Sequence, residues 1–242
     1  MTGSTSIRLP PGLFITATGT GAGKTFVSRG LAAALSALGR RVAALKPIET
    51  GLPDPSAVPI DAATDAALLA RACGRPELAD APGFYRAAIP AAPYAVSIAT
   101  GSAPLDLEQL ADAVRAAANG SELALIEGAG GLLVPLDRDH TVADLIASLG
   151  LPILLVAPNT LGVLSHALTA AESADRRNLR VAALVLTHLA PASDTSDPSR
   201  PHNAAILAER LPFPILRFAH CADSSDVTLA QAAISANLLS LF

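Results

Sequence analysis

The sequence predicts an α/β fold in which a doubly wound, mainly parallel sheet is flanked by helices. Short, nearly continuous apolar runs alternate with longer stretches of helical periodicity, as expected for parallel strands that are covered on both faces. A chain of 242 residues can bury one such core, and the sequence contains neither an internal repeat nor a clear linker, so we expect a single domain over residues 1–242. The expected strands cover residues 13–17, 42–45, 123–126, 153–157 and 181–186, with a shorter one near Ile215.

Helix boundaries follow from capping and stop signals between these runs. A helix over residues 24–38 is closed by Gly39, because glycine readily takes the left-handed conformation that ends helices. Another begins at Asp106, with Gln109 placed for a capping box, and ends at Gly120. Further helices are expected over residues 62–73, 142–149, 163–176, 203–211 and 229–239. The polar stretch 190–203 is interpreted as a surface loop, and the proline-rich stretch 51–59 as a loop on the ligand-binding side of the sheet.

Composition excludes several classes of protein. Apolar residues make up 51% of the chain and the net charge is only −4, so neither a disordered chain nor a broad nucleic-acid surface is expected. Cys73 and Cys221 fit no metal spacing and no disulfide framework, and we expect buried free thiols. The N-terminal residues lack a signal-peptide pattern, and no apolar run approaches the ~18 residues of a membrane span. We expect a soluble, cytoplasmic protein with neither a nucleic-acid nor a membrane partner.

The stretch TATGTGAGKTF, residues 16–26, predicts a phosphate-binding loop between the first strand and the first helix. Its glycines allow successive backbone N–H groups to face an anion, and the helix N-terminus adds partial positive charge. Lys24 would reach the β- and γ-phosphates, and the hydroxyl of Thr25 would bind Mg²⁺. Thr18 stands where the common pattern has glycine, so the alternative is a glycine-rich turn that binds nothing. We favour the phosphate loop, because Gly-Lys-Thr at a helix start serves little structural purpose.

Charged residues at other element ends are further candidates. Lys46 ends the second strand, where a second cation suits a reaction that gathers negative oxygens; the alternative is an ordinary lysine at a strand edge. Glu127 follows a hydrophobic strand and precedes a Gly-Ala-Gly-Gly run, and we expect it to reach Mg²⁺, because a buried carboxylate without a partner is costly. Asp65 lies near a helix start, where an acid also suits the helix dipole without any ligand. Among five histidines, His188 follows a strand end and could contact a ligand.

Three stretches together resemble the dethiobiotin synthetase family, whose members are ATP-dependent carboxylases of biotin synthesis. They are TGTGAGKT at residues 18–25, KPIETG at residues 46–51 and EGAGG at residues 127–131. Order and separations agree from about residue 13 to residue 189, with supporting signs at residues 90–93 (PAAP) and 161–162 (LG). The second and third stretches are more specific than the phosphate loop, which many families share. The resemblance also accounts for Thr18, because this family's loop does not require glycine there.

The resemblance implies a P-loop NTPase-like fold, with ATP as co-substrate and Mg²⁺ as cofactor. Nucleotide binding would involve Gly21, Ala22, Gly23, Lys24, Thr25, Glu127, Gly130 and Thr187, and Mg²⁺ would be held by Thr25, Asp65 and Glu127. The catalytic residues would be Lys24, Lys46 and Thr20, and the substrate would contact Thr20, Lys46, Thr50, Gly162 and Ser165. In the family the substrate lies at a dimer interface, so a homodimer is expected, in which Gly162 and Ser165 come from the partner.

The implied reaction needs no protein nucleophile. An uncharged amine of 7,8-diaminononanoate takes up CO₂ as a carbamate, which attacks the γ-phosphate of the nucleotide and forms a mixed anhydride. The second amine then closes the urea ring of dethiobiotin and expels phosphate. Two lysines, a metal ion and backbone N–H groups would hold the anions in line, which is how phosphoryl transfer is usually catalysed.

Several positions depart from the family pattern. Thr187 stands where a base-contacting asparagine is common, and the stretch 215–220 (ILRFAH) lacks the usual base-loop sequence. The choice of nucleobase is therefore left open, and other nucleoside triphosphates are alternatives to ATP. Gly21 replaces a frequent acid, and Ser165 replaces a frequent asparagine.

Two other functions are compatible with the same ATPase core. An amide ligase of the cobyrinate diamide synthase type would carry an additional glutaminase domain, for which 242 residues leave no room. A partitioning-type ATPase switch would carry a second lysine in the loop, at the position of Gly19, and a basic amphipathic tail for a membrane. We favour the carboxylase over both.

Overall fold

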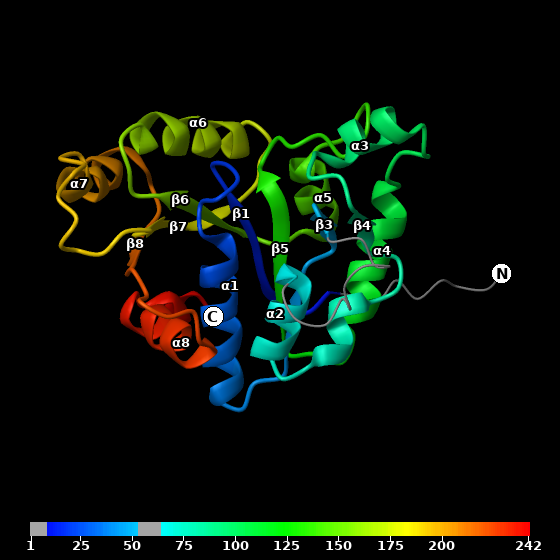
Figure 1. Cartoon of the computed structure of the whole chain (residues 1–242), viewed down its shortest axis with the longest axis horizontal. Coiled ribbons are helices and arrows are strands. Elements are labelled where there is room, and N and C mark those ends of the chain that lie inside the picture. The colour runs from blue at the N-terminus through cyan, green and yellow to red at the C-terminus, as the bar shows by residue number, and fades with distance from the viewer. Residues whose placement is uncertain (1–8, 53–63) are drawn as a thin grey trace.

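A six-stranded parallel sheet forms the centre of the computed structural model, which describes residues 9–52 and 64–242 (Figure 1). Its strand order is β2-β5-β1-β6-β7-β8, and each pair of neighbours is parallel. The strands are β1 (Gly12–Ala17), β2 (Val42–Leu45), β5 (Leu123–Gly131), β6 (Ile153–Pro158), β7 (Val181–Thr187) and β8 (Ile215–Phe218). Strands β1, β2 and β6 are buried along almost their whole length, which explains why their sequences are continuously apolar.

Helices cover both faces of this sheet (Figure 1). Helix α1 packs against α2 and α8, α4 packs against α5, and α6 packs against α7. Their bounds are α1 (Lys24–Ala37), α2 (Asp65–Ala72), α3 (Pro93–Thr100), α4 (Leu107–Ala118), α5 (Val142–Leu149), α6 (Val163–Asp175), α7 (Arg200–Arg210) and α8 (Asp226–Ser235), with short 3₁₀ turns at η1 (Pro76–Asp80) and η2 (Leu238–Leu241). The doubly wound α/β architecture that the sequence predicts is confirmed.

The strand order reverses beside β1, and this reversal fixes where a ligand can bind. After β1 the chain runs to β2 on one side, returns through β5 beside β1, and continues through β6 to the opposite edge. In open α/β sheets the crevice lies outside the carboxyl ends of the strands at such a reversal. The loop after β1, the end of β2 and the end of β5 therefore meet at one place.

Several predicted boundaries are wrong. Strand β5 continues through Gly131, which pairs with Ala17 of β1 after a shift in register, so Glu127 lies within the strand instead of at its end. Helix α7 begins at Arg200, which shortens the predicted loop over residues 190–203. Helix α8 begins at Asp226 because Ser225 caps it, and it ends at Ser235, before Asn237 takes a left-handed φ of 58°.

Some structure lies outside the predictions. Strands β3 (Ile48–Thr50) and β4 (Tyr85–Ala87) form a separate parallel pair, and α3 and η1 are additional helical segments. The start of the predicted helix over residues 62–73 and most of the predicted loop over residues 51–59 lie outside the described residues, as do the first eight residues.

The expectations for the two cysteines and for membrane-spanning helices can also be compared with the structure. Both cysteines are free, but only Cys73 is buried, whereas Cys221 is half-buried. Among the helices of the described part of the chain, none has the length and apolar character to cross a membrane.

Candidate nucleotide-binding site

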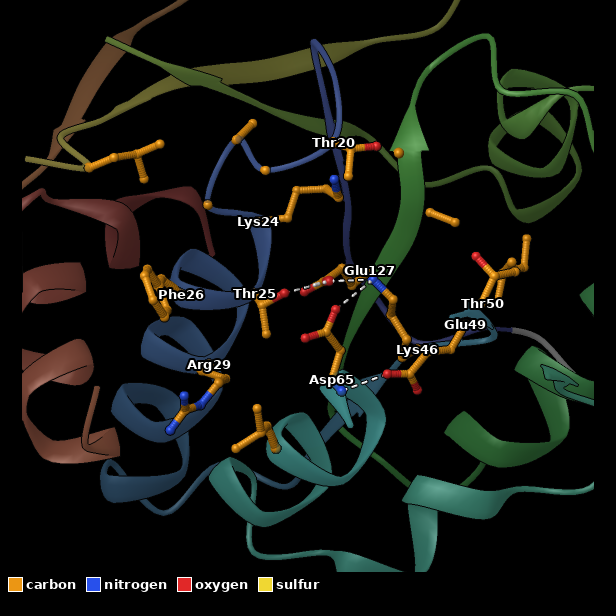
Figure 2. Close-up of a pocket in the computed structure, with 18 residues that line it drawn as sticks. Thr20, Lys24, Thr25, Phe26, Arg29, Lys46, Glu49, Thr50, Asp65 and Glu127 are labelled. Atoms are coloured by element: carbon orange, nitrogen blue, oxygen red, sulfur yellow. Dashed lines mark hydrogen bonds and ion pairs between the residues drawn. The ribbon is translucent and has the colours of Figure 1, made fainter. Parts of the chain in front are cut away.

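A cavity of about 500 Å³ opens at the carboxyl edge of the sheet, where the strand order reverses (Figure 2). The loop after β1, the first turns of α1 and α2, the stretch after β2 and the end of β5 all contribute to its walls. It is lined by Thr20, Gly21, Ala22, Gly23, Lys24, Thr25, Phe26, Arg29, Lys46, Ile48, Glu49, Thr50, Asp65, Leu68, Glu127, Ala129, Gly130 and Leu189. Thus most residues selected from the sequence lie together in one cavity.

The loop over residues 18–23 is shaped by glycine and supported from below. Gly23 is the N-cap of α1 with φ 87°, a conformation that strains other residues. A Cβ at Gly23 would lie 3.2 Å from Cγ2 of Thr187. The hydroxyl of Thr187 donates to the carbonyl oxygen of Ala22 at 2.7 Å, and its oxygen lies 3.3 Å from the carbonyl oxygen of Ala157. The loop is therefore fastened to the ends of β6 and β7.

The chain contains only two lysines, Lys24 and Lys46, and both are buried in this cavity, with 7% and 6% of their surface exposed. A buried lysine is rare unless it has a partner. The ammonium of Lys24 donates to the carbonyl oxygen of Gly19 at 3.4 Å. Burial, assisted by the positive charge of Lys46, lowers the pKa of Lys24 from 10.5 to about 8. An anion placed in the loop would relieve this cost.

Lys46 is the buried centre of a charge network (Figure 2). Its Nζ lies 2.6 Å from Oε1 of Glu127 and 3.3 Å from Oδ2 of Asp65, and it also donates to the carbonyl oxygen of Gly128 at 3.2 Å. Burial disfavours the charged form of Lys46, but the negative charges of Glu127 and Asp65 outweigh burial and raise its pKa. Lys46 is therefore charged and held in place before any ligand binds.

Glu127 joins this network to the phosphate loop. Its side chain is fully buried, and Oε1 accepts a hydrogen bond from the hydroxyl of Thr25 at 3.1 Å as well as the one from Lys46. Oε2 is buried and has no hydrogen-bond partner among the described residues. A buried carboxylate oxygen without a partner is costly and marks a place where a cation or a donor is missing.

The run after Glu127 brings bare backbone to the cavity wall. Ala129 and Gly130 line the cavity, and Gly130 has φ 62°. A Cβ at Gly130 would lie 2.7 Å from Cγ2 of Val134 and 3.7 Å from Oγ1 of Thr20. A side chain there would clash with Val134, so the close approach of this backbone to Val134 requires glycine.

Asp65 and Thr50 flank the cavity on the side of β3. Asp65 is the first residue of α2, and its side chain is 39% exposed. Its backbone N–H donates to Oε1 of Glu49 at 2.6 Å. Glu49 is itself buried, and burial together with the charge of Asp65 raises its pKa. Glu49 was not selected from the sequence, although it stands between two residues that were.

Arg29 is a second cavity residue that sequence reasoning missed. It is 6% exposed and donates to Oδ1 of Asp226 through Nε (3.0 Å) and Nη2 (2.7 Å), and to the carbonyl oxygen of Ser224 (2.7 Å). These bonds tie the loop after β8 to α1. The partners are almost two hundred residues apart in the chain, so no local pattern indicates the pairing.

Four sequence candidates lie outside the cavity. Thr187 is 2% exposed and sits beneath the loop, where its hydroxyl already has protein partners. Gly162 and Ser165 are exposed at the start of α6 and do not line the cavity. His188 is half-buried. Burial and, to a smaller extent, the positive charges of nearby arginines lower its pKa.

The doubly wound fold and the glycine-rich loop with buried lysines define a P-loop nucleotide-binding protein. A family model described as an AAA domain matches residues 11–219. The ATP-dependent dethiobiotin synthetase BioD of Anaeromyxobacter dehalogenans (strain 2CP-C) is 39% identical over 207 residues, which cover 85% of this chain and 89% of the relative. The protein of the same name from Caulobacter vibrioides (strain NA1000 / CB15N) is 44% identical over 186 residues, which cover 75% and 82%. The chain belongs to the dethiobiotin synthetase family.

Solved structures support the fold independently. The cell division ATPase MinD of Pyrococcus furiosus has a TM-score of 0.52 at 18% identity, covering 92% of this chain and 98% of MinD. Chloroplast FtsY of Physcomitrella patens has a TM-score of 0.51 at 17% identity, covering 93% of this chain and 67% of FtsY. At such identities the likeness concerns the fold alone.

Proposed function

We propose that this chain is a ligase that forms dethiobiotin from 7,8-diaminononanoate and CO₂ with consumption of ATP, in the synthesis of biotin. Relatives that match most of the chain are named for that activity. The observation that carries the proposal is the cavity in which both lysines and two carboxylates surround a phosphate-type loop. The relatives do not favour the cobyrinate diamide synthase or partitioning-switch alternatives.

The residues suit a reaction whose intermediates are all anions. One amine of the substrate and CO₂ form a carbamate, the carbamate oxygen attacks the γ-phosphorus, and the nucleotide leaves as diphosphate. The second amine then attacks the carbonyl carbon of the mixed anhydride, closes the ring and releases phosphate. Lys24 would neutralise the transferred phosphoryl group, and Lys46 would neutralise the carbamate, because both cations already face the cavity.

The remaining cavity residues supply binding and orientation. The backbone of Gly21, Ala22 and Gly23, at the start of α1, would hold the phosphates. Thr20, beside Gly130, and Thr50, at the end of β3, would hold the diamine. Thr187 would act through the loop, since its hydroxyl is bonded to Ala22. The sequence departures at Thr187 and residues 215–220 leave nucleoside triphosphates other than ATP as further substrates to compare.

The oxygen atoms of Thr25, Asp65 and Glu127 fit Mg²⁺. The described residues contain no group of three or more His, Cys, Asp or Glu side chains placed for a metal ion, but Mg²⁺ usually needs only one or two carboxylates together with substrate phosphates. The unpartnered, buried Oε2 of Glu127 supports the assignment. When bound, Mg²⁺ would offset charge on the β- and γ-phosphates.

We also propose that two copies of this single domain complete each site. A neighbouring cavity of about 490 Å³ extends from Thr18 and Thr20 of the loop to His166 of α6 and includes Leu133, which is 48% exposed. Leu161, before α6, is 81% exposed. Exposed apolar residues beside a cavity suit a protein interface, and Gly162 and Ser165 of the partner would then lie near the substrate. We expect the dimer to act in the cytoplasm.

The deciding experiment measures release of nucleoside diphosphate by the purified protein. We expect release only when 7,8-diaminononanoate, bicarbonate, Mg²⁺ and ATP are all present, and dethiobiotin should form in equal amount. Release that does not depend on the diamine would refute the function. Lys24→Gln should reduce turnover at least ~100-fold, since it removes a charge that faces the transition state. Arg180→Gln removes a charge from an exposed residue outside the cavity and is the matched control.

A further inference from the structure

We propose that Glu49 is a positioning residue that fixes the start of α2, and through it Asp65, against the Lys46–Glu127 pair. The proposal rests on the proposed function in one respect, which is that Asp65 and Lys46 belong to the reacting site. Glu49 itself has a different task, because its carboxylate is engaged with backbone and is not directed at the loop.

The carboxylate of Glu49 acts as a helix cap supplied from another element. Its oxygens accept hydrogen bonds from the backbone N–H groups of Asp65 (2.6 Å) and Ala66 (3.3 Å), while the hydroxyl of Thr64 accepts from Ala67 (3.1 Å). The first N–H groups of a helix have no partner inside the helix. Three of them in succession are therefore satisfied, two by a residue of β3.

The strand that carries Glu49 is held firmly. Arg86 of β4 is opposite Glu49 in the register of the β3–β4 pair. Its guanidinium donates to the carbonyl oxygens of Lys46 (3.0 Å), Tyr85 (3.1 Å) and Ala79 (2.8 Å). Arg86 thus fixes the backbone of Lys46. Glu49 lies three residues later on the same segment, and its hydrogen bonds link this segment to the start of α2.

The consequence is a fixed separation between Asp65 and Lys46, two site residues that belong to different elements. Oδ2 of Asp65 lies 3.3 Å from Nζ of Lys46, although the side chain of Asp65 is 39% exposed and could otherwise turn to solvent. An ionised carboxylate offers two acceptors to two N–H donors. A glutamine at position 49 would present an NH₂ group to one of them and leave that N–H without an acceptor.

The test compares Glu49→Gln with Asp106→Asn. Asp106 caps α4 by accepting from the N–H of Gln109 at 3.0 Å, and it does not line the cavity, so Asp106→Asn makes the same carboxylate-to-amide change at a helix cap elsewhere, where a single amide oxygen can still accept. We expect Glu49→Gln to weaken binding of Mg²⁺–ATP about tenfold, as loss of residues that orient metal ligands usually does, with affinity for metal-free ATP changed less than about twofold. Asp106→Asn should change neither affinity. Calorimetry measures both.

Two further measurements separate positioning from a general structural role. In an Asp65→Asn background, Glu49→Gln should have no additional effect on Mg²⁺–ATP affinity, because Glu49 acts through Asp65. Hydrogen exchange of the Ala66 amide should accelerate in Glu49→Gln, while amides in the middle of α1 stay protected. Equal losses for metal-free and Mg²⁺-bound ATP, or an unchanged effect in the Asp65→Asn background, would overturn the proposal. None of these readouts needs the diamine, so failure of the proposed carboxylation would be seen separately.

Discussion

The two lysines of the cavity are expected to respond in opposite directions to the same substitution. Lys24→Met keeps the length of the side chain and removes a charge whose pKa is lowered from 10.5 to about 8. A tenfold change in proton affinity corresponds to about 1.4 kcal/mol, so at pH 7 the charged form costs the folded state ~3 kcal/mol. Removing the charge therefore stabilises the folded state by this amount. Loss of the hydrogen bond to Gly19 offsets about 1 kcal/mol of that stabilisation. We expect Lys24→Met to stabilise the ligand-free protein by ~1–3 kcal/mol.

Lys46→Met should have the opposite effect. It leaves Glu127, which is fully buried, without the ammonium that lies 2.6 Å from its Oε1. Removing one partner of a buried ion pair typically costs about 3–5 kcal/mol. That is a large part of the ~5–15 kcal/mol that holds a typical domain folded.

Urea unfolding of both variants and the wild type, without nucleotide or divalent cations, measures these changes. The pKa of Lys24 is lower in the folded than in the unfolded state, so its cost is complete below pH 8 and declines as the pH rises from 8 to 10.5. At pH 9.5 the advantage of Lys24→Met should shrink by about 2 kcal/mol. The reasoning is refuted if both variants shift in the same direction at pH 7, or if the advantage of Lys24→Met does not change with pH.

Three further substitutions probe other parts of the molecule. Gly30→Ala should lower the melting temperature, because its Cβ would lie 2.5 Å from a carbonyl oxygen of α8. Such overpacking costs ~1–3 kcal/mol, whereas the gain in helix propensity is at most ~1 kcal/mol. A raised melting temperature would contradict this prediction. Asp137→Asn should bring the pKa of His140 down toward 6.5 in an NMR titration, because the hydrogen bond that the protonated ring donates to the Asp137 carboxylate raises this pKa. In the wild type this pair stabilises the fold below pH 6.5, and the contribution is lost as the pH rises through the folded pKa. Thr187→Val should weaken ATP binding about fivefold in calorimetry, because losing the hydrogen bond to Ala22 frees the loop at a cost of about 1 kcal/mol, and an unchanged affinity would remove Thr187 from loop support.

The central fold was predictable because its signals are local. Parallel strands buried on both faces must be apolar at successive positions, and the predicted strand over residues 42–45 matches β2. Strand β4 is half-buried throughout and has an arginine in its centre, so apolar periodicity does not mark it. The extension of β5 beyond Ile126 is rich in glycine, which is typical of loops, and only pairing with β1 makes it a strand.

The candidate site was predictable where its residues stand at the start of a helix or just after a strand. Lys24, Lys46 and Asp65 each stand at the start of a helix or just after a strand, and the sheet brings these positions together. Glu49 and Arg29 act through partners that only the folded chain supplies. The family pattern marked Thr187 as a departure in base contact, whereas its buried hydroxyl is occupied by a loop carbonyl.

The placement of both lysines in one cavity also determines where side-chain amines can react on this protein. All surface side-chain cations other than histidine are arginines, whose guanidinium groups stay protonated and are poor nucleophiles. Acylating, glycating or carbamoylating agents therefore meet lysine only inside the cavity, where Lys24 is the amine that loses its proton first. Lysine modification by such agents would therefore fall in the candidate site, and a bound nucleotide would protect these side chains.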